Sequence, residues 1–139
     1  MIILDTNVVS EVMRNRPDSR VFTWLEGCDP ATLFTTTITE AEILVGIARL
    51  AAGVRQRNML REAEEVFRTD LAGRVLAFDR SAAAAYAEIA ARRERMGKRI
   101  DFADGQIAAI ALVQGARLAT GNVRHFRDCG IDIIDPWTA

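Results

Sequence analysis

The sequence contains few of the side chains used in covalent and zinc chemistry. Lys98 is the only lysine and His125 the only histidine among 139 residues. Lysine-centred chemistry therefore has one candidate, and a nuclease built on a histidine pair is excluded. Cys28 and Cys129 are far apart and lie in no CxxC or Cys/His cluster, so reduced structural thiols are favoured over a zinc site or a disulfide framework.

Long apolar runs and an excess of one charge are also missing. The longest wholly apolar run, 107–113, is far shorter than the about 20 residues needed to span a bilayer. The N-terminus does not resemble a secretory signal, so we expect a cytoplasmic protein without a membrane partner. The net charge of −1 gives no general basic field, so any nucleic-acid contact has to be local. The length and the 50% hydrophobic content predict one compact domain over 1–139.

Short apolar segments alternate with helical patterns along the whole chain. An α/β fold follows from this alternation: a three-layer sandwich with a mainly parallel central sheet of four to five strands flanked by helices. Ligands of such folds bind beyond the carboxyl ends of the strands, where Asp5 and the segment 37–42 should lie. The predicted strands are 1–4, 32–37, 75–78, 117–120 and 131–134, and the predicted helices are 6–13, 18–27, 38–50, 55–70, 81–96 and 104–114.

Three acids stand at predicted helix entrances, and they are the main candidates for function. Asp5 follows the first apolar strand, Glu42 enters an apolar helix, and Asp104 opens another. Carboxylates that gather in a folded site repel one another and lose hydration, so such a site usually needs a divalent cation. A metal-dependent active site is the leading hypothesis.

Helix capping is the competing explanation for each of these acids. Asp5 can cap the helix that follows it, Thr39-x-x-Glu42 has the form of a capping box, and Asp101-x-x-Asp104 has the form of an N-cap with an acid in the first turn. Capping alone predicts no function.

The neighbours of these acids favour a site over simple capping. Glu42 shares its helix with many apolar residues, so we expect it to be partly buried. Gly46, on the same helix face, and Gly105, beside Asp104, are unfavourable inside helices by roughly 1 kcal/mol against alanine. Each suggests that another backbone or a ligand comes close.

Four motifs, taken in order, resemble those of the PIN-domain nucleases. Within that superfamily the chain most resembles the VapC toxins, and more closely their FitB branch, which shares the Asp-Thr-Asn-Val-x-Ser-Glu opening and a late Pro-Trp. The motifs are Asp5-Thr6-Asn7, Thr39-x-x-Glu42-x-x-x-Gly46, Asp104-x-x-Ile107-Ala108-Ala109 and Ala119-Thr120-Gly121-Asn122-Val123-Arg124-His125-Phe126.

The resemblance implies a metal site and assigns its residues. Asp5, Glu42 and Asp104 correspond to the family's acids that bind Mg²⁺ or Mn²⁺. Asn122 stands where FitB-like relatives can carry an aspartate, so one firmly held metal is expected, with a second weak or dependent on substrate. Supporting roles, in ordering waters or carboxylates, fall to Thr6, Asn7 and Thr120.

The resemblance also implies an activity and partners. It predicts a metal-dependent endoribonuclease that is the toxin of a toxin-antitoxin pair. A small antitoxin is expected to cover the active-site groove, often placing an arginine among the acids. A homodimer is expected too, with DNA bound only through the antitoxin.

Two alternatives remain open from the sequence. One is a catalytically weak PIN-fold binding module, which Asn122 supports. The other is an aspartyl-phosphate phosphatase or receiver with Asp5 as its phosphorylated residue, but it lacks a second aspartate at the position of Asn7 and a lysine after Lys98.

Two basic stretches and the single histidine are interpreted as structural features and not as parts of a functional site. The arginines of 14–20 and the basic run 92–99 are read as solvated helix faces ahead of RNA contacts. His125 is read as a loop or packing residue.

Overall fold

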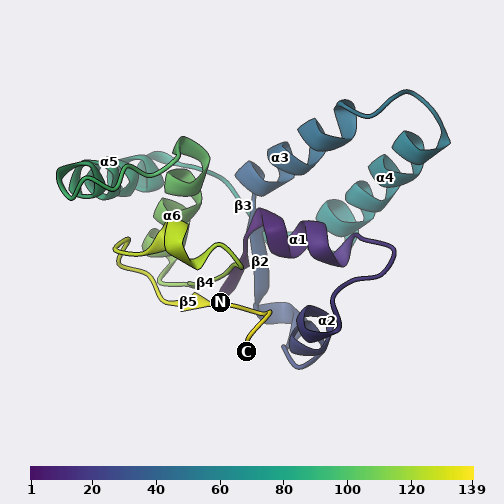
Figure 1. The fold of residues 1–139 in the computed structure, drawn as a ribbon, viewed down its shortest axis with the longest axis horizontal. Coiled ribbons are helices and arrows are strands. Elements are labelled where there is room, and N and C mark those ends of the chain that lie inside the picture. Colours follow the sequence, from purple (N-terminus) through teal and green to yellow (C-terminus); the bar gives the residue numbers. More distant parts are fainter.

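The chain folds around a parallel sheet, and the computed structural model describes residues 1–139 (Figure 1). The strand order is β3-β2-β1-β4-β5, and every neighbouring pair is parallel. The predicted α/β class with four to five mainly parallel strands is therefore confirmed. The strands are β1 (Ile2–Leu4), β2 (Leu33–Thr36), β3 (Val75–Leu76), β4 (Arg117–Ala119) and β5 (Ile133–Ile134).

Six helices connect and cover these strands, and most lie close to their predicted positions. Two 3₁₀ turns, Pro30–Thr32 and Val123–Phe126, and a wider π turn at Glu65–Asp70 complete the elements. The helices are α1 (Thr6–Val12), α2 (Ser19–Glu26), α3 (Thr37–Ala48), α4 (Val54–Glu64), α5 (Arg80–Arg95) and α6 (Phe102–Gln114).

Some boundaries differ from the prediction. The helix expected over 55–70 ends its regular part at Glu64. The helix expected over 38–50 ends at Ala48, and Gly53 is the N-cap of α4. The last helix starts at Phe102, two residues before Asp104.

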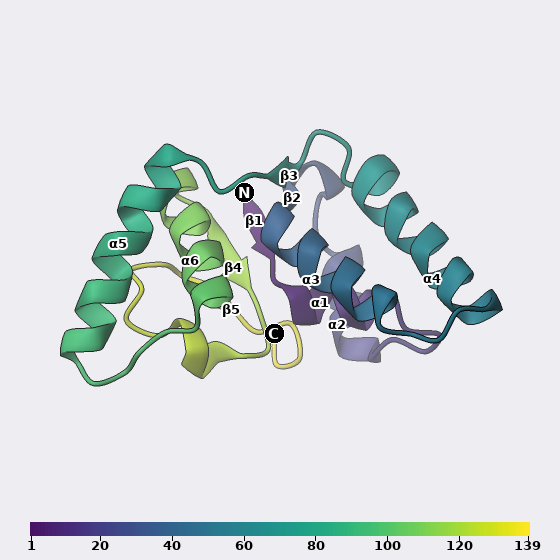
Figure 2. The same cartoon turned by 90° about the horizontal axis from the view of Figure 1, so that it is seen from above.

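Two hydrophobic cores lie on the two faces of the sheet, which makes three layers (Figure 2). Successive side chains of a strand point to opposite faces. Ile3 accordingly packs with α5 and α6, whereas Ile2 and Leu4 pack with α1, α2 and α3. Burial on both faces explains why the strands are continuously apolar rather than alternating.

The topology brings three chain segments to one edge of the sheet. β1 is central, and its neighbours β2 and β4 run parallel to it. Asp5 directly follows β1, α3 directly follows β2, and Thr120 directly follows β4. Because parallel strands end at the same edge, residues from three distant parts of the sequence meet there. No helix combines the length and the apolar character needed to cross a membrane.

Candidate active site

Asp5 lies buried at the carboxyl end of β1, with 3% of its surface exposed. It caps α1, as the capping interpretation predicted, because its Oδ1 accepts a hydrogen bond from the Thr6 amide at 2.8 Å. Its Oδ2 accepts two more, from Thr120 Oγ1 at 2.7 Å and from Asn7 Nδ2 at 3.2 Å. Capping accounts for one oxygen only, so the other is held by contacts that a cap does not need.

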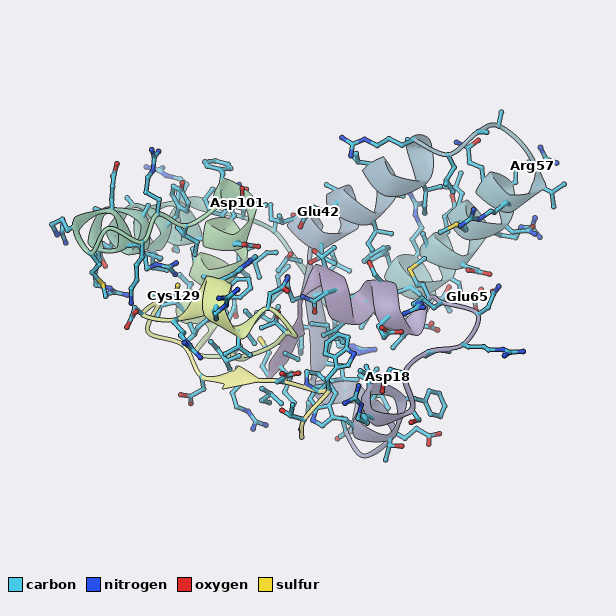
Figure 3. All side chains as sticks on the ribbon, in the orientation of Figure 1. Asp18, Glu42, Arg57, Glu65, Asp101 and Cys129 are labelled. Atoms are coloured by element: carbon cyan, nitrogen blue, oxygen red, sulfur yellow. The ribbon has the colours of Figure 1, made fainter.

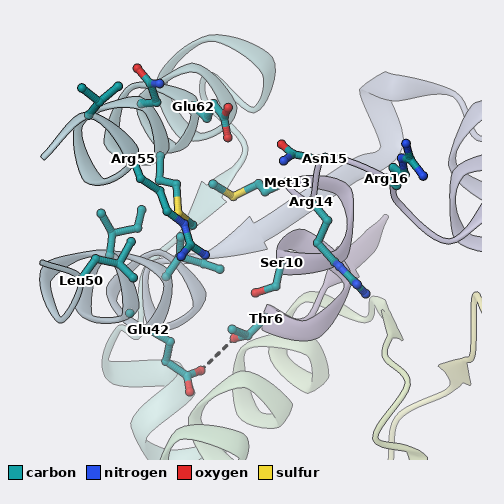
Figure 4. A pocket seen from close by; sticks show the side chains of 16 residues that line it. Thr6, Ser10, Met13, Arg14, Asn15, Arg16, Glu42, Leu50, Arg55 and Glu62 are labelled. Carbon is teal, nitrogen blue, oxygen red and sulfur yellow. Dashed lines mark hydrogen bonds between the residues drawn. The ribbon is translucent and has the colours of Figure 1, made fainter.

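Glu42 comes from α3 and is not part of a capping box. The N-cap of α3 is Thr36, whose Oγ1 accepts from the Thr39 amide at 3.1 Å, so Glu42 lies in the second turn of the helix. Its Oε1 instead accepts a hydrogen bond from Thr6 Oγ1 at 2.8 Å (Figure 4). The capping interpretation of Glu42 is wrong, and its contact is with the segment that follows β1.

The expected partial burial of Glu42 is also wrong. Glu42 is exposed, at the end of α3 nearest α6 (Figure 3). Only part of α3 faces inward, through Ile43 and Ile47, while Leu44 and Val45 are 38% and 47% exposed. An apolar sequence on all sides of α3 did not mean burial on all sides.

Asp104 lies in the first turn of α6, half-buried and paired with the only histidine. Asp101 is the N-cap residue of α6, but its side chain makes no capping hydrogen bond. Asp104 Oδ2 lies 3.1 Å from His125 Nδ1, with 20% and 55% of the two side chains exposed. His125 is therefore not merely a loop or packing residue, since its ring contacts one of the candidate acids.

These three acids line one polar cavity of about 450 Å³, and no hydrophobic residue borders it. Each acid is nevertheless held by its own hydrogen-bond donors. As the side chains stand, no three carboxylate, imidazole or thiol groups are close enough to bind one ion together. The lining residues are Asp5, Thr6, Asn7, Ser10, Glu11, Arg14, Glu42, Asp104 and Asn122.

Two of the acids have raised pKa values, mainly because burial removes water from their charged forms. Burial, together with smaller contributions from the charges of Asp104 and Glu42, raises the pKa of Asp5 to about 6, although hydrogen bonds from Thr120 and Thr6 oppose the shift. Burial also raises the pKa of Asp104, and His125 only partly opposes this shift. Buried carboxylates that repel one another favour either a proton or a cation.

The predicted supporting residues all lie beside the acids. Asn7 Oδ1 accepts from the Gly121 amide at 3.1 Å, while its Nδ2 donates to Asp5 and to Thr120 Oγ1, each at 3.2 Å. The Asn122 amide donates to Thr120 Oγ1 at 3.0 Å, and its side chain borders the cavity. Asn7 and Thr120 thus tie the loop after β4 to the end of β1 around Asp5.

Sequence reasoning missed Glu11, which lines this cavity, and the contact of His125 with Asp104. Glu11 is 8% exposed and accepts from the Asp18 amide at 3.2 Å and from Arg14 Nη1 at 3.3 Å. The signal was present, because a glutamate one helical turn after Val8 shares an apolar helix face and must find partners inside. His125 offered no comparable signal.

The basic stretches turn out to be structurally diverse. Arg20 is exposed and paired with Asp18, whose Oδ2 lies 2.8 Å from Arg20 Nη2, as a solvated face predicts. In the stretch 92–99 the other basic residues are exposed, as predicted, but Arg93 is buried, which corrects the solvated interpretation at that one position. Its Nε donates to the Lys98 carbonyl at 2.7 Å, and its Nη1 donates to the carbonyls of His125 and Arg127 at 3.0 and 2.8 Å.

Comparison with known proteins identifies the family. The family model of the PIN domain matches residues 2–130 of this chain. This chain belongs to the PIN-domain family. Among its relatives are the VapC ribonuclease Y4jK of Sinorhizobium fredii, 42% identical over 99% of this chain and 98% of the relative, and Toxin FitB of Neisseria gonorrhoeae, 38% identical over 99% of each.

The PIN-domain architecture is also found in solved structures. The structure of FitAB bound to an IR36 DNA fragment contains a chain that superposes on this one with a TM-score of 0.92. The two are 36% identical over 99% of this chain and 96% of that chain. The predicted resemblance to PIN domains, and to the VapC and FitB proteins among them, is thereby confirmed.

Proposed function

We propose that this protein, a PIN-like domain over 1–139, is the toxin of a toxin-antitoxin pair and a metal-dependent endoribonuclease. The observation that carries the proposal is the shared cavity, where Asp5, Glu42 and Asp104 meet although they come from distant parts of the chain. A relative 42% identical is named a VapC ribonuclease, which favours RNA as the substrate.

The donor set fits a hard divalent cation such as Mg²⁺ or Mn²⁺. All three acids offer oxygen, which these ions prefer, and the raised pKa values of Asp5 and Asp104 indicate a site short of positive charge. Oε2 of Glu42 and Oδ1 of Asp104 are not used in the hydrogen bonds to Thr6 and His125. Small side-chain rotations toward a cation are therefore compatible with these contacts. When bound, such an ion supplies charge that polarises a scissile phosphate and lowers the pKa of an attacking water.

The protein's own residues prepare the site for that ion. Thr120 and Asn7 keep one oxygen of Asp5 oriented, and Thr6 fixes one oxygen of Glu42. Residues that orient metal-binding carboxylates in this way raise their affinity for the ion. Asn122, which lines the cavity, offers a neutral oxygen in place of a carboxylate, so we propose one firmly bound metal with a second that is weak or dependent on substrate.

The partners follow from the same family relationship. The superposed chain is part of a FitAB complex bound to DNA, so we propose a small antitoxin partner for this chain and DNA binding only through it. An antitoxin arginine can neutralise the acid cavity by pairing with its carboxylates. We also propose a homodimer that acts in the cytoplasm.

Cleavage assays test the proposal directly. Partner-free protein is incubated with a mixed RNA pool in Mg²⁺, in Mn²⁺ and in chelator. We expect cleavage with either ion, none in chelator, and a loss of at least 100-fold in Asp104→Asn and Glu42→Gln. Glu40→Gln is the matched control, since Glu40 lies on α3 two residues before Glu42 and outside the cavity.

Two results contradict the proposal. Unchanged cleavage in Asp104→Asn and Glu42→Gln refutes the site assignment. Absence of any metal-dependent cleavage by the pure wild-type protein favours the binding module, and turnover of an aryl phosphate without RNA cleavage favours the phosphatase alternative.

A further inference from the structure

We propose that Arg93 is a positioning residue for the acid cavity, because its buried guanidinium holds the loop that carries His125 where the imidazole reaches Asp104. The inference rests on the proposed metal-dependent function, since Asp104 is one of the three acids proposed to hold the cation. Arg93 does not line the cavity and makes no hydrogen bond to Asp104, so its effect on the site is indirect.

The loop 125–129 lies against α5 and α6 and is fixed from inside by one nitrogen of Arg93 (Figure 2). Nη1 donates to the carbonyls of His125 and Arg127 at 3.0 and 2.8 Å. Asp128 is the only residue other than glycine with a positive φ, at 62°, which is an uncommon conformation for such a residue. The shape of this loop therefore depends on the contacts that hold it.

The same guanidinium also fixes the turn that leads into α6. Nε of Arg93 donates to the Lys98 carbonyl at 2.7 Å, and the Lys98 amide donates to the Arg93 carbonyl at 2.9 Å. This turn precedes Phe102, the first residue of α6. Arg93 thus joins the segment that enters α6 to the loop after β4, and the side chains that meet across these two segments are Asp104 and His125.

The outer contacts of the loop do not replace Arg93. Nε and Nη2 of Arg92 donate to the Asp128 carbonyl at 3.2 and 2.8 Å, and Nζ of Lys98 lies 3.7 Å from Asp128 Oδ2. These contacts are exposed and hold Asp128, whereas Arg93 is buried and bonds the backbone of His125 itself. Hydrogen bonds shielded from water are stronger and more rigid than exposed ones. Loss of Arg93 should therefore release the imidazole from its carboxylate partner even while the loop stays attached.

Stability alone does not explain a charged residue at this position. Arg93 is 5% exposed, and it takes part in none of the salt bridges of the chain. Burial of a charge without a counter-charge opposes folding. The planar fork of a guanidinium can, however, bind carbonyls of two segments at fixed angles, which an apolar side chain cannot do. The contacts of Arg93 point to a role in geometry.

The single histidine makes its pair with Asp104 directly observable. His125 is the only histidine, so ¹⁵N-histidine labelling gives signals from this ring alone. A ring whose Nδ1 donates to a carboxylate keeps its proton on Nδ1, and loss of that contact releases this tautomer. The two ring ¹⁵N shifts are measured in the metal-free protein at about pH 8, where imidazole is ordinarily neutral. Asp104→Ala supplies the shifts of the unpaired ring.

Arg93→Met and Arg93→Lys are compared with the wild type, and Arg74→Met and Arg74→Lys are the matched controls. Arg74 lines neither the acid cavity nor the groove beside it. It also donates to three backbone carbonyls, those of Pro30, Leu33 and Asp70. Its loss should destabilise the fold in the same way without reaching the acid cavity. Thermal unfolding identifies the folded variants and the temperature for the measurements.

We expect Arg93→Met to move both ¹⁵N shifts toward those of Asp104→Ala. It should also lower the Mn²⁺ affinity measured by calorimetry about 10-fold, at the lower end of the range for lost orienting contacts. Arg93→Lys keeps the charge but not the fork, so its changes should be intermediate. Both Arg74 variants should keep the wild-type shifts and the wild-type affinity.

Wild-type ¹⁵N shifts in a folded Arg93→Met would overturn the inference, as would equal losses of Mn²⁺ affinity in Arg93→Met and Arg74→Met. If Arg93→Met does not fold, Arg93→Lys decides, and wild-type shifts and affinity there would show that the fork is not needed to position the loop. Loss of folding in both Arg93 variants would mean that Arg93 acts through stability alone. The ¹⁵N shifts need neither metal nor RNA, so these failures are distinguishable from failure of the proposed function, in which the wild type itself binds no Mn²⁺ or cleaves no RNA.

Discussion

The imidazole Nδ1 of His125 lies 3.1 Å from Oδ2 of Asp104, one of the three acids that line the cavity. The two residues are 21 positions apart, one on the 3₁₀ turn after β4 and the other in the first turn of α6. The pair is partly exposed, so its effect on global stability is small, at about 0–1 kcal/mol. The pair also affects the protonation of Asp104, because His125 opposes the rise in the pKa of that acid.

Removing His125 is expected to raise the pKa of Asp104 further. Burial already raises this pKa, and the charge and hydrogen bond of His125 oppose that shift. His125→Ala should therefore move the midpoint of the Asp104 titration, followed by carboxyl ¹³C NMR, to higher pH. His125→Gln keeps a donor without the charge and should give an intermediate shift. An unchanged Asp104 midpoint in His125→Ala would show that the pair is absent in solution.

Thr120→Val is expected to weaken metal binding more than it weakens the fold. Thr120 Oγ1 donates to Asp5 Oδ2 at 2.7 Å and lowers the pKa of Asp5, so its loss favours the protonated acid. Loss of a residue that orients a metal ligand typically lowers metal affinity about 10- to 100-fold, so we expect a loss of that order for Thr120→Val. Mn²⁺ titration by calorimetry measures this.

Thr35→Val is the matched control for Thr120→Val. Both threonines are fully buried, but Thr35 Oγ1 donates to the Leu4 carbonyl at 2.8 Å instead of to an acid. The control should lose stability of about 1–3 kcal/mol, because a buried acceptor loses its donor, and should keep its Mn²⁺ affinity. Equal losses of affinity in both variants would mean that Thr120 acts only through the fold.

Asp5 should make the metal-free protein less stable at neutral pH than in mild acid. Its pKa is about 6 in the folded state and 3.8 as the ordinary value, so the folded state holds the proton more tightly. The stabilisation of the folded state that comes from protonated Asp5 is fully present below pH 3.8 and is lost as the pH rises through about 6. Between pH 5 and pH 7.5 the free energy of unfolding should fall by about 1 kcal/mol from this group.

Urea unfolding in chelator at the two pH values measures that loss. Asp5→Asn cannot titrate and should show a smaller fall between them, while the contribution of Asp104 remains in both proteins. Identical pH dependence in the wild type and Asp5→Asn would contradict the raised pKa of Asp5.

The sequence predicted the layers and the meeting of the acids because both depend on local patterns. Apolar strands separated by helices imply parallel strands, and parallel strands end at one edge. Asp5 directly follows β1 and Glu42 lies on the helix that follows β2, so their approach was a consequence of topology. Asp104 does not follow a strand, so topology alone does not bring it to this edge. The order of the motifs was the reason to include it in the predicted site.

The missed features depend on contacts between distant segments. The predicted burial of Glu42 is wrong because the sequence of a helix that is apolar on all sides does not reveal which side faces the sheet. Arg93 looked like part of a solvated basic run, and its carbonyl partners at His125 and Arg127 lie more than 30 positions further on. Sequence patterns give no signal for a side chain that bonds to backbone groups of a later loop.

Arg93 should be among the most sensitive positions of the fold. Its guanidinium bonds three carbonyls and holds the loop that carries His125, and no carboxylate shares its charge. Arg93→Ala leaves those carbonyls without donors, at a cost of about 3 kcal/mol or more. Arg92→Ala is the comparison, since Arg92 is exposed and bonds only the Asp128 carbonyl. Urea unfolding should show the larger loss of unfolding free energy in Arg93→Ala. Equal losses in the two variants would mean that the buried contacts of Arg93 contribute no more to stability than the exposed contact of Arg92.

Two helical glycines should respond to alanine in opposite directions. Both were expected to mark a close approach, but a Cβ at Gly46 meets nothing within 4 Å, so that expectation is wrong for Gly46. A Cβ at Gly105 would lie 2.6 Å from Cε2 of Tyr86, so there the close approach is real. The Tyr86 ring has little room to move, because Phe78 and Phe102 pack edge-on against it at centroid distances of 6.2 and 5.1 Å.

Gly46→Ala should therefore raise the free energy of unfolding by up to about 1 kcal/mol, since alanine is the better helix former and has open space. Gly105→Ala gains the same helix propensity, but forcing Tyr86 aside costs about 1–3 kcal/mol, so a net loss is expected. Chemical unfolding of both variants measures the difference. Stabilisation by Gly105→Ala would mean that Tyr86 yields freely and that α5 and α6 are not tightly packed beside Asp104.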